Sequence, residues 1–66
     1  MDKDWRELLV VESPTRAALI KALLEENEIP VIILNQKDSS YLNFGSIKIH
    51  VLAKDVIRAK ALIKEL

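Results

Sequence analysis

The spacing of apolar residues changes several times along the chain, and the order of these changes constrains the fold more than any other feature. Residues 46–52 alternate strictly between the two sides of an extended chain, which is typical of a half-buried strand. The apolar side of that strand consists of Ile47, Ile49 and Val51. Segments 5–12 and 29–35 are short, apolar and bounded by charged, polar or proline residues. They therefore predict two further strands.

Residues 14–27 and 54–66 have the spacing of amphipathic helices instead. Ser13 can cap the first helix, and Pro14 suits its first turn because no N–H is needed there. We expect the first helix to bury Ala17, Leu19, Ile20, Leu23 and Leu24. We expect the second to bury Val56, Ala59, Leu62, Ile63 and Leu66, and to leave Ile57 outside this stripe.

The predicted order is strand, helix, strand, strand, helix, within a single domain of residues 1–66. A right-handed crossover between the first two strands leaves room for the third strand between them, antiparallel to both. The sheet order is then 1-3-2, with both helices on one face. The sequence thus predicts an α+β, ferredoxin-like fold that stops before its fourth strand.

This arrangement leaves the first strand as an open edge and one face of the sheet without a helix. That face would carry either Leu8 and Val10 or Leu9 and Val11, together with an apolar pair from the second strand. Sixty-six residues without cysteine have no disulfide to stabilise a small core. We therefore expect a homo-oligomer, most simply a dimer. Its candidate contact residues are Trp5, Leu8, Val10, Ile32, Leu34 and His50.

Composition argues against several classes of function. The absence of cysteine and the single histidine exclude thiolate and multi-histidine metal sites, and we expect no metal and no cofactor. The longest apolar run is four residues, so we expect no membrane span, and the acidic start does not resemble a signal peptide. The second helix is basic, but the net charge is zero and aromatic residues for stacking are scarce, so nucleic-acid binding is not expected.

The polar stretch 36–45 contains the only glycine and connects the second and third strands. Loops held by rigid strands often carry binding residues. The candidates for contact with a partner or ligand are Lys37, Asp38, Ser39, Ser40, Tyr41 and Asn43. The alternative is a turn formed around Asp38, with Tyr41, Leu42 and Phe44 folded back over the core.

Catalytic arrangements find little support in the residues. His50 is expected on the uncovered face of the third strand, where a general base would also need a nucleophile and an orienting carboxylate. Ser39 and Asp38 are adjacent in sequence, so their spacing does not favour a triad with His50. The turn after the first strand, at 12–15, has no glycine for binding phosphate. We therefore predict no enzymatic activity and no catalytic residue.

Short sequence motifs along nearly the whole chain match those of a known family in both order and spacing. The matching residues are Ser13-Pro14, the segment 18–21, Leu23-Leu24, Ile29-Pro30, Asn35, Tyr41, Asp55, Ala59 and Leu62-Ile63. In this the sequence resembles the family called "putative prokaryotic signal transducing protein", a family of unknown function grouped with the GlnB-like fold. The resemblance implies a cytoplasmic bacterial protein with a regulatory role. The nucleotide-contacting motifs of GlnB-like regulators have no counterpart here, so ATP binding does not carry over.

One position departs from the family pattern: Glu28 stands where such sequences usually have glycine before Ile29-Pro30. If that position is left-handed, Glu28 costs about 1 kcal/mol relative to glycine, unless Asn27 takes the left-handed cap. The main functional hypothesis is a regulatory interaction module that self-associates and presents residues 36–45 to a partner. The alternative is a small-molecule sensor, similar to ACT domains, that holds a metabolite between protomers.

Overall fold

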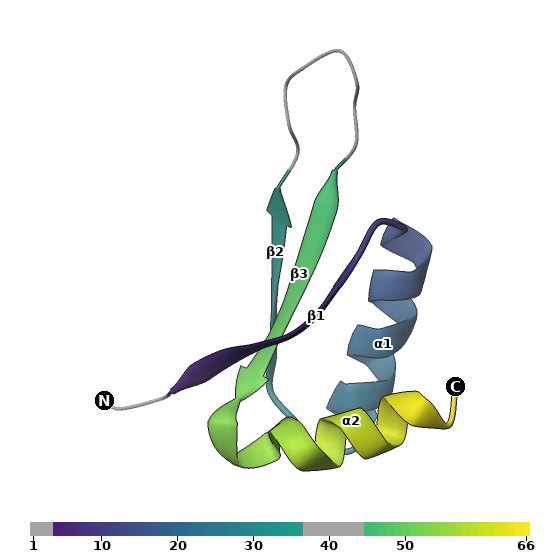
Figure 1. The fold of residues 1–66 in the computed structure, drawn as a ribbon. Helices are drawn as coiled ribbons and strands as arrows, with labels where there is room; N and C mark the ends of the chain where they lie inside the picture. Colours follow the sequence, from purple (N-terminus) through teal and green to yellow (C-terminus); the bar gives the residue numbers. More distant parts are fainter. Residues whose placement is uncertain (1–3, 37–44) are drawn as a thin grey trace.

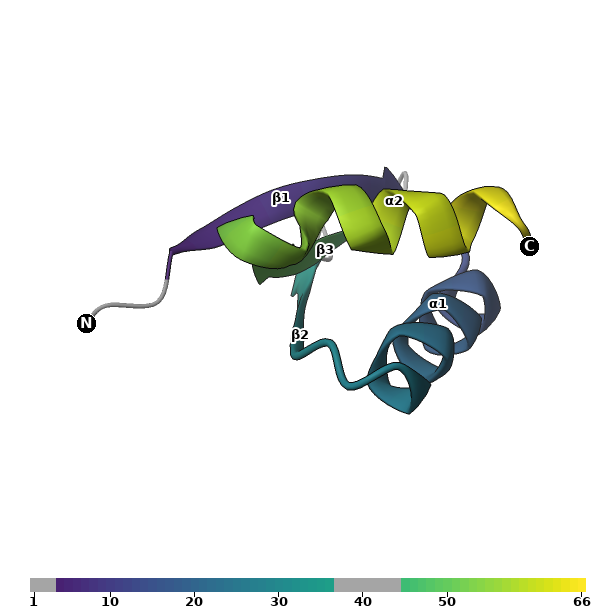
Figure 2. The same cartoon turned by 90° about the horizontal axis from the view of Figure 1, so that it is seen from below.

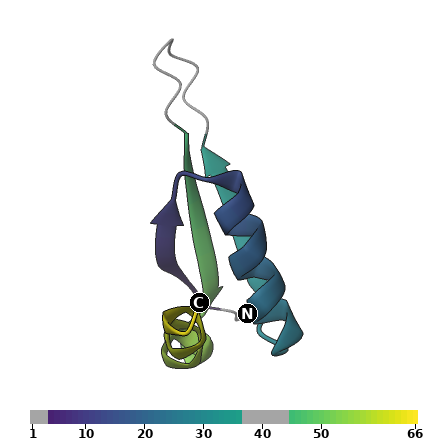
Figure 3. The ribbon, with the colours of Figure 1, turned by 90° about the vertical axis from the view of Figure 1, so that its right-hand side faces the viewer.

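The computed structural model describes residues 4–36 and 45–66, and it contains the predicted order of elements (Figure 1). The strands form one antiparallel sheet in the order β1-β3-β2. The helix α1 lies along one face, and α2 crosses the lower end of the sheet and extends to the same side, where it contacts α1 (Figures 2 and 3). The α+β, ferredoxin-like prediction is confirmed. The elements are β1 (Trp5–Val11), α1 (Pro14–Glu26), β2 (Val31–Gln36), β3 (Ser46–Leu52), the 3-10 turn η1 (Ala53–Asp55) and α2 (Val56–Lys64).

The start of α1 follows from its capping residues. Ser13 is extended, with φ −98° and ψ 121°, and its Oγ accepts a hydrogen bond of 3.2 Å from the backbone N–H of Arg16. Pro14 follows at the first helical position. The side chain thus satisfies one of the N–H groups that a helix start leaves free, as the sequence predicts.

The end of α1 is closed by backbone hydrogen bonds that turn the chain toward β2. The N–H of Ile29 donates to the Leu24 carbonyl at 2.9 Å, and the N–H of Glu28 donates to the Glu25 carbonyl at 3.0 Å. Glu28 has a φ of 64°, so it takes the left-handed position that the sequence left open between Glu28 and Asn27. The turn places Ile29 in the core just before Pro30.

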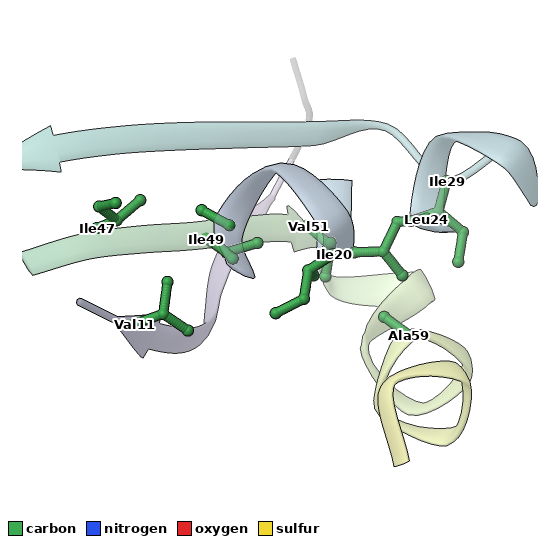
Figure 4. Packing of buried hydrophobic residues seen from close by; sticks show 9 residues of the cluster. Val11, Ile20, Leu24, Ile29, Ile47, Ile49, Val51 and Ala59 are labelled. Carbon is green, nitrogen blue, oxygen red and sulfur yellow. The ribbon is translucent and has the colours of Figure 1, made fainter. Parts of the chain in front are cut away.

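The core lies between the two helices and the inner face of the sheet, by which we mean the face toward α1 and α2 (Figure 4). The central strand β3 contributes three buried side chains, and β1, α1, α2 and the α1–β2 turn contribute the others. These buried residues are Val11, Ala17, Ile20, Leu24, Ile29, Ile47, Ile49, Val51 and Ala59. The strict alternation of residues 46–52 is therefore the pattern around which the core is built.

Two of the helix positions that were expected to be buried are exposed instead. Leu19 is 53% exposed, because it lies about 130° around α1 from the centre of the buried line formed by Ala17, Ile20 and Leu24. Leu66 is also exposed, because α2 ends before it, at Lys64. Ile57 is 84% exposed, as expected for a residue outside the buried stripe.

The first strand carries an irregularity that simple alternation did not predict. The register between β1 and β3 shifts between Glu7 and Leu9, which is the signature of a β-bulge at Leu8. Leu8 and Leu9 therefore both pack against the core, while Val10 stays exposed and Val11 is buried. The expectation that Leu8 shares the uncovered face with Val10 is wrong for this reason.

Candidate functional site

The face of the sheet that points away from both helices carries side chains that do not belong to the buried core. Its residues follow from the register, because directly paired residues of an antiparallel sheet point to the same side. One row joins Glu7, His50 and Ile32, and the next joins Val10, Lys48 and Leu34. With the pair at the end of β1, this outer face comprises Trp5, Glu7, Val10, Ile32, Leu34, Lys48, His50 and Leu52.

Apolar side chains on the outer face remain open to solvent. Leu34 is 46% exposed, Val10 44% and Ile32 36%, on the two strands that flank β3. Single exposed apolar residues are common on protein surfaces, but residues that share a face of neighbouring strands form a patch. The outer face is therefore a candidate interaction surface.

Two opposite charges lie within this apolar surface. Glu7 on β1 pairs with His50, and Lys48 on β3 pairs with Val10, so the two charges occupy diagonal corners of a four-residue unit. Among residues 4–36 and 45–66, the ion pairs join Arg6 to Asp4 and Lys21 to Glu25, and neither involves Glu7 or Lys48. The outer face thus combines apolar contact area with one carboxylate, one ammonium group and the imidazole of His50.

His50 lies at the centre of the outer face. Its neighbours in register are the carboxylate side chain of Glu7 and the alkyl side chain of Ile32. Its Nδ1 is buried and has no hydrogen-bond partner within the part of the chain that the structure describes. The imidazole therefore has a carboxylate-bearing residue on one side and an apolar residue on the other, and neither can act as a hydroxyl nucleophile.

The predicted contact residues divide into two groups. Trp5, Val10, Ile32, Leu34 and His50 come together on the outer face, whereas the bulge removes Leu8 from it. The predicted loop contacts lie outside the described residues, and so do the three alternative core-covering residues Tyr41, Leu42 and Phe44. The loop contacts in question are Lys37, Asp38, Ser39, Ser40, Tyr41 and Asn43.

A contact between the two helices was not predicted from the sequence. The guanidinium of Arg58 in α2 donates a hydrogen bond of 2.7 Å to the backbone carbonyl of Asn27, at the end of α1. Asn27 in turn donates from Nδ2 to the Leu23 carbonyl at 2.8 Å. One basic residue of α2 therefore binds the end of α1, where a positive charge is favourable beside free carbonyl groups.

Charge at the start of β1 is paired locally. The Arg6 guanidinium donates a hydrogen bond of 2.7 Å to Asp4, and this bond lowers the pKa of the Asp4 carboxyl. Both side chains are largely exposed, so the pair contributes little to stability. The Asp4 carbonyl also accepts a hydrogen bond of 2.8 Å from the N–H of Ala53, which ties the start of β1 to η1.

Asp55 is one of the residues that carry the family resemblance, and its burial was not predicted from the sequence. It precedes α2, where the helix dipole favours a negative charge, but its side chain makes no capping hydrogen bond. Its Oδ2 is buried without a hydrogen-bond partner among the described residues. Aspartate is common at the start of exposed helices, so nothing in the local sequence marks this one as buried.

Two further features bear on the class of site. Residues 4–36 and 45–66 contain no group of three or more His, Asp or Glu side chains placed to hold a metal ion. No helix in these ranges is long and apolar enough to cross a membrane.

Comparison with known proteins gives one result. No significant match is found among the curated proteins or the solved structures. A family model described as "Putative prokaryotic signal transducing protein" matches residues 5–66, from the first residue of β1 to the end of the chain. The chain therefore belongs to the family of putative prokaryotic signal transducing proteins.

Proposed function

We propose that this protein is a non-catalytic interaction module of a cytoplasmic signalling system, and that it self-associates as a dimer through the outer face. The observation that carries the proposal is the apolar area of Val10, Ile32 and Leu34, on a sheet face that neither helix covers. The family description supports a role in signal transduction. The surroundings of His50 support a binding role over a catalytic one.

The energetics favour a weak dimer. Burying the exposed part of Val10, Ile32 and Leu34 contributes roughly 1 kcal/mol for each side chain, because each is already more than half buried. Two copies then gain about 6 kcal/mol from these residues, whereas association costs about 4–15 kcal/mol. The half-buried Trp5 and Leu52 must add to the contact. We therefore expect reversible association that depends on concentration, which suits a regulatory switch.

The test is the molar mass in solution of the wild type and of two matched variants, measured by sedimentation velocity over a concentration series. Leu34→Lys places a charge in the outer face, and it should leave the protein monomeric where the wild type dimerises. Ile57→Lys makes the same kind of change at an exposed residue of α2, and it should leave association unchanged. A wild type that stays monomeric throughout, or equal association by both variants, would contradict the proposal.

We further propose that residues 36–45 present contacts to a partner protein, with Lys37 and Tyr41 as the principal ones. Support for this comes from the sequence: polar and aromatic side chains stand together between two paired strands. A variant carrying both Lys37→Ala and Tyr41→Ala should recover less partner in affinity capture from the native cytoplasm. Equal recovery by the variant and the wild type would remove the loop from the proposal.

A further inference from the structure

We propose that the two copies meet face to face about a two-fold axis that pairs Glu7 of each copy with Lys48 of the other. This arrangement rests on the proposed self-association through the outer face, and it specifies how the surfaces fit. It follows from the four-residue unit of Glu7, His50, Lys48 and Val10, in which the two charges occupy one diagonal.

The geometry of the sheet makes this pairing possible. Neighbouring strands are about 4.8 Å apart, and residues on the same face of a strand are about 7 Å apart, so Glu7 and Lys48 are about 8 Å apart along the diagonal. In a two-fold interface, if one residue contacts a second, the second also contacts the first. A two-fold axis in the interface plane that is perpendicular to this diagonal and passes through its midpoint therefore sets Glu7 of each copy opposite Lys48 of the other.

The same axis also pairs the apolar residues. Val10 and His50 form the other diagonal of the unit, so they stay close to the axis and face their own equivalents. Leu34 lies beyond Lys48 on β2, and the axis carries it toward the position of Trp5 in the second copy. The exposed leucine would then cover the half-buried indole, which adds the apolar contact that Val10, Ile32 and Leu34 lack by themselves.

The charge pattern favours a second copy as the occupant. A partner surface of one sign could neutralise only one of Glu7 and Lys48 and would leave the other desolvated and unpaired, which is costly. A purely apolar partner would leave both unpaired. A second copy supplies one acid and one base in the matching positions, and any register that sets Glu7 against Glu7 is penalised by repulsion.

The experiment uses two charge reversals, first separately and then mixed. In a homodimer, Glu7→Lys alone brings two ammonium groups together at both pairing positions, and Lys48→Glu alone brings two carboxylates together there. Each variant should dimerise at least about tenfold more weakly than the wild type. In the heterodimer that forms in an equimolar mixture, positions 7 and 48 are both lysine in the Glu7→Lys chain and both glutamate in the Lys48→Glu chain. Both pairing positions therefore join opposite charges again, and association should return toward the wild-type value. Lys60→Glu, a reversal at an exposed residue of α2, should have no effect.

The mixture separates contacts between copies from contacts within one chain. The contacts within each variant chain are the same before and after mixing. Any recovery of dimerisation must therefore come from contacts with the second copy. If the wild type and the variants dimerise equally, or if mixing restores nothing, the two-fold pairing is wrong, and the comparison of Leu34→Lys with Ile57→Lys decides separately whether the outer face is the interface. If the wild type is monomeric at all concentrations, both the pairing and the proposed self-association are wrong.

Discussion

At the scale of single residues, Glu28 shows how the fold holds a residue in an unfavourable backbone conformation. Its φ of 64° lies in the left-handed region, which costs a residue with a Cβ atom about 1 kcal/mol more than glycine. The conformation persists because the hydrogen bond from Ile29 to Leu24 closes α1 and delivers Ile29 to the core. Tertiary packing therefore compensates for the strain.

We predict that Glu28→Gly stabilises the protein by about 1 kcal/mol, because glycine adopts the left-handed conformation without a steric penalty. In thermal denaturation this should appear as a rise in Tm of about 4–8 °C for a chain of this size. Glu28→Gln removes the charge but not the Cβ atom, so it separates the two effects. It should raise stability only by the amount gained when a negative charge is removed from the C-terminal end of α1.

A matched control lies inside α1. Ala22→Gly, at an exposed position in the middle of the helix, should destabilise the protein by about 1 kcal/mol, because glycine has a low helix propensity. The change in stability caused by glycine should therefore have opposite signs at residues 22 and 28, because the two residues have different backbone conformations. Destabilisation by Glu28→Gly would show that the left-handed assignment is wrong.

At the scale of elements, Arg58 connects the two helices at the end of α1. Its hydrogen bond to the Asn27 carbonyl is 2.7 Å long and joins residues that are far apart in sequence. We predict that Arg58→Met lowers the free energy of unfolding by about 1 kcal/mol, because the methionine keeps most of the aliphatic stem but cannot donate. Urea denaturation measures this change.

The control for this prediction is Lys60→Met on the same helix. Lys60 is exposed, and no hydrogen bond of its side chain is found among the described residues, so its replacement should change stability by less than about 0.5 kcal/mol. Equal effects of the two substitutions would show that the bond from Arg58 contributes nothing specific.

The elements also show which parts of the fold can be predicted from the sequence. The β3 alternation and the Ser13-Pro14 cap depend on local chemistry, and both were predicted correctly. The bulge at Leu8 was not, because the apolar run of β1 fits either face of a strand and only pairing with β3 fixes its register. For the same reason Arg58 could not be assigned to Asn27 before the helices were placed together.

At the scale of the whole molecule, the outer face is the surface through which we propose that the protein associates. Ile32, Leu34 and His50 were placed there from the sequence, because the order 1-3-2 and the strand alternation together determine which residues face away from the helices. The diagonal of Glu7 and Lys48 was not foreseen, because it depends on the register between β1 and β3. The family description names signal transduction but does not say which surface takes part in it.

The most direct test of the central claim is a dilution series of the ¹⁵N-labelled protein by NMR, from millimolar to micromolar concentration. If the outer face is the dimer interface, the amide signals of Val10, Ile32 and Lys48 should shift and broaden with concentration, while those of Ile57 and Ala61 in α2 stay constant. Spectra that do not change with concentration, or changes confined to the helices, would contradict the account.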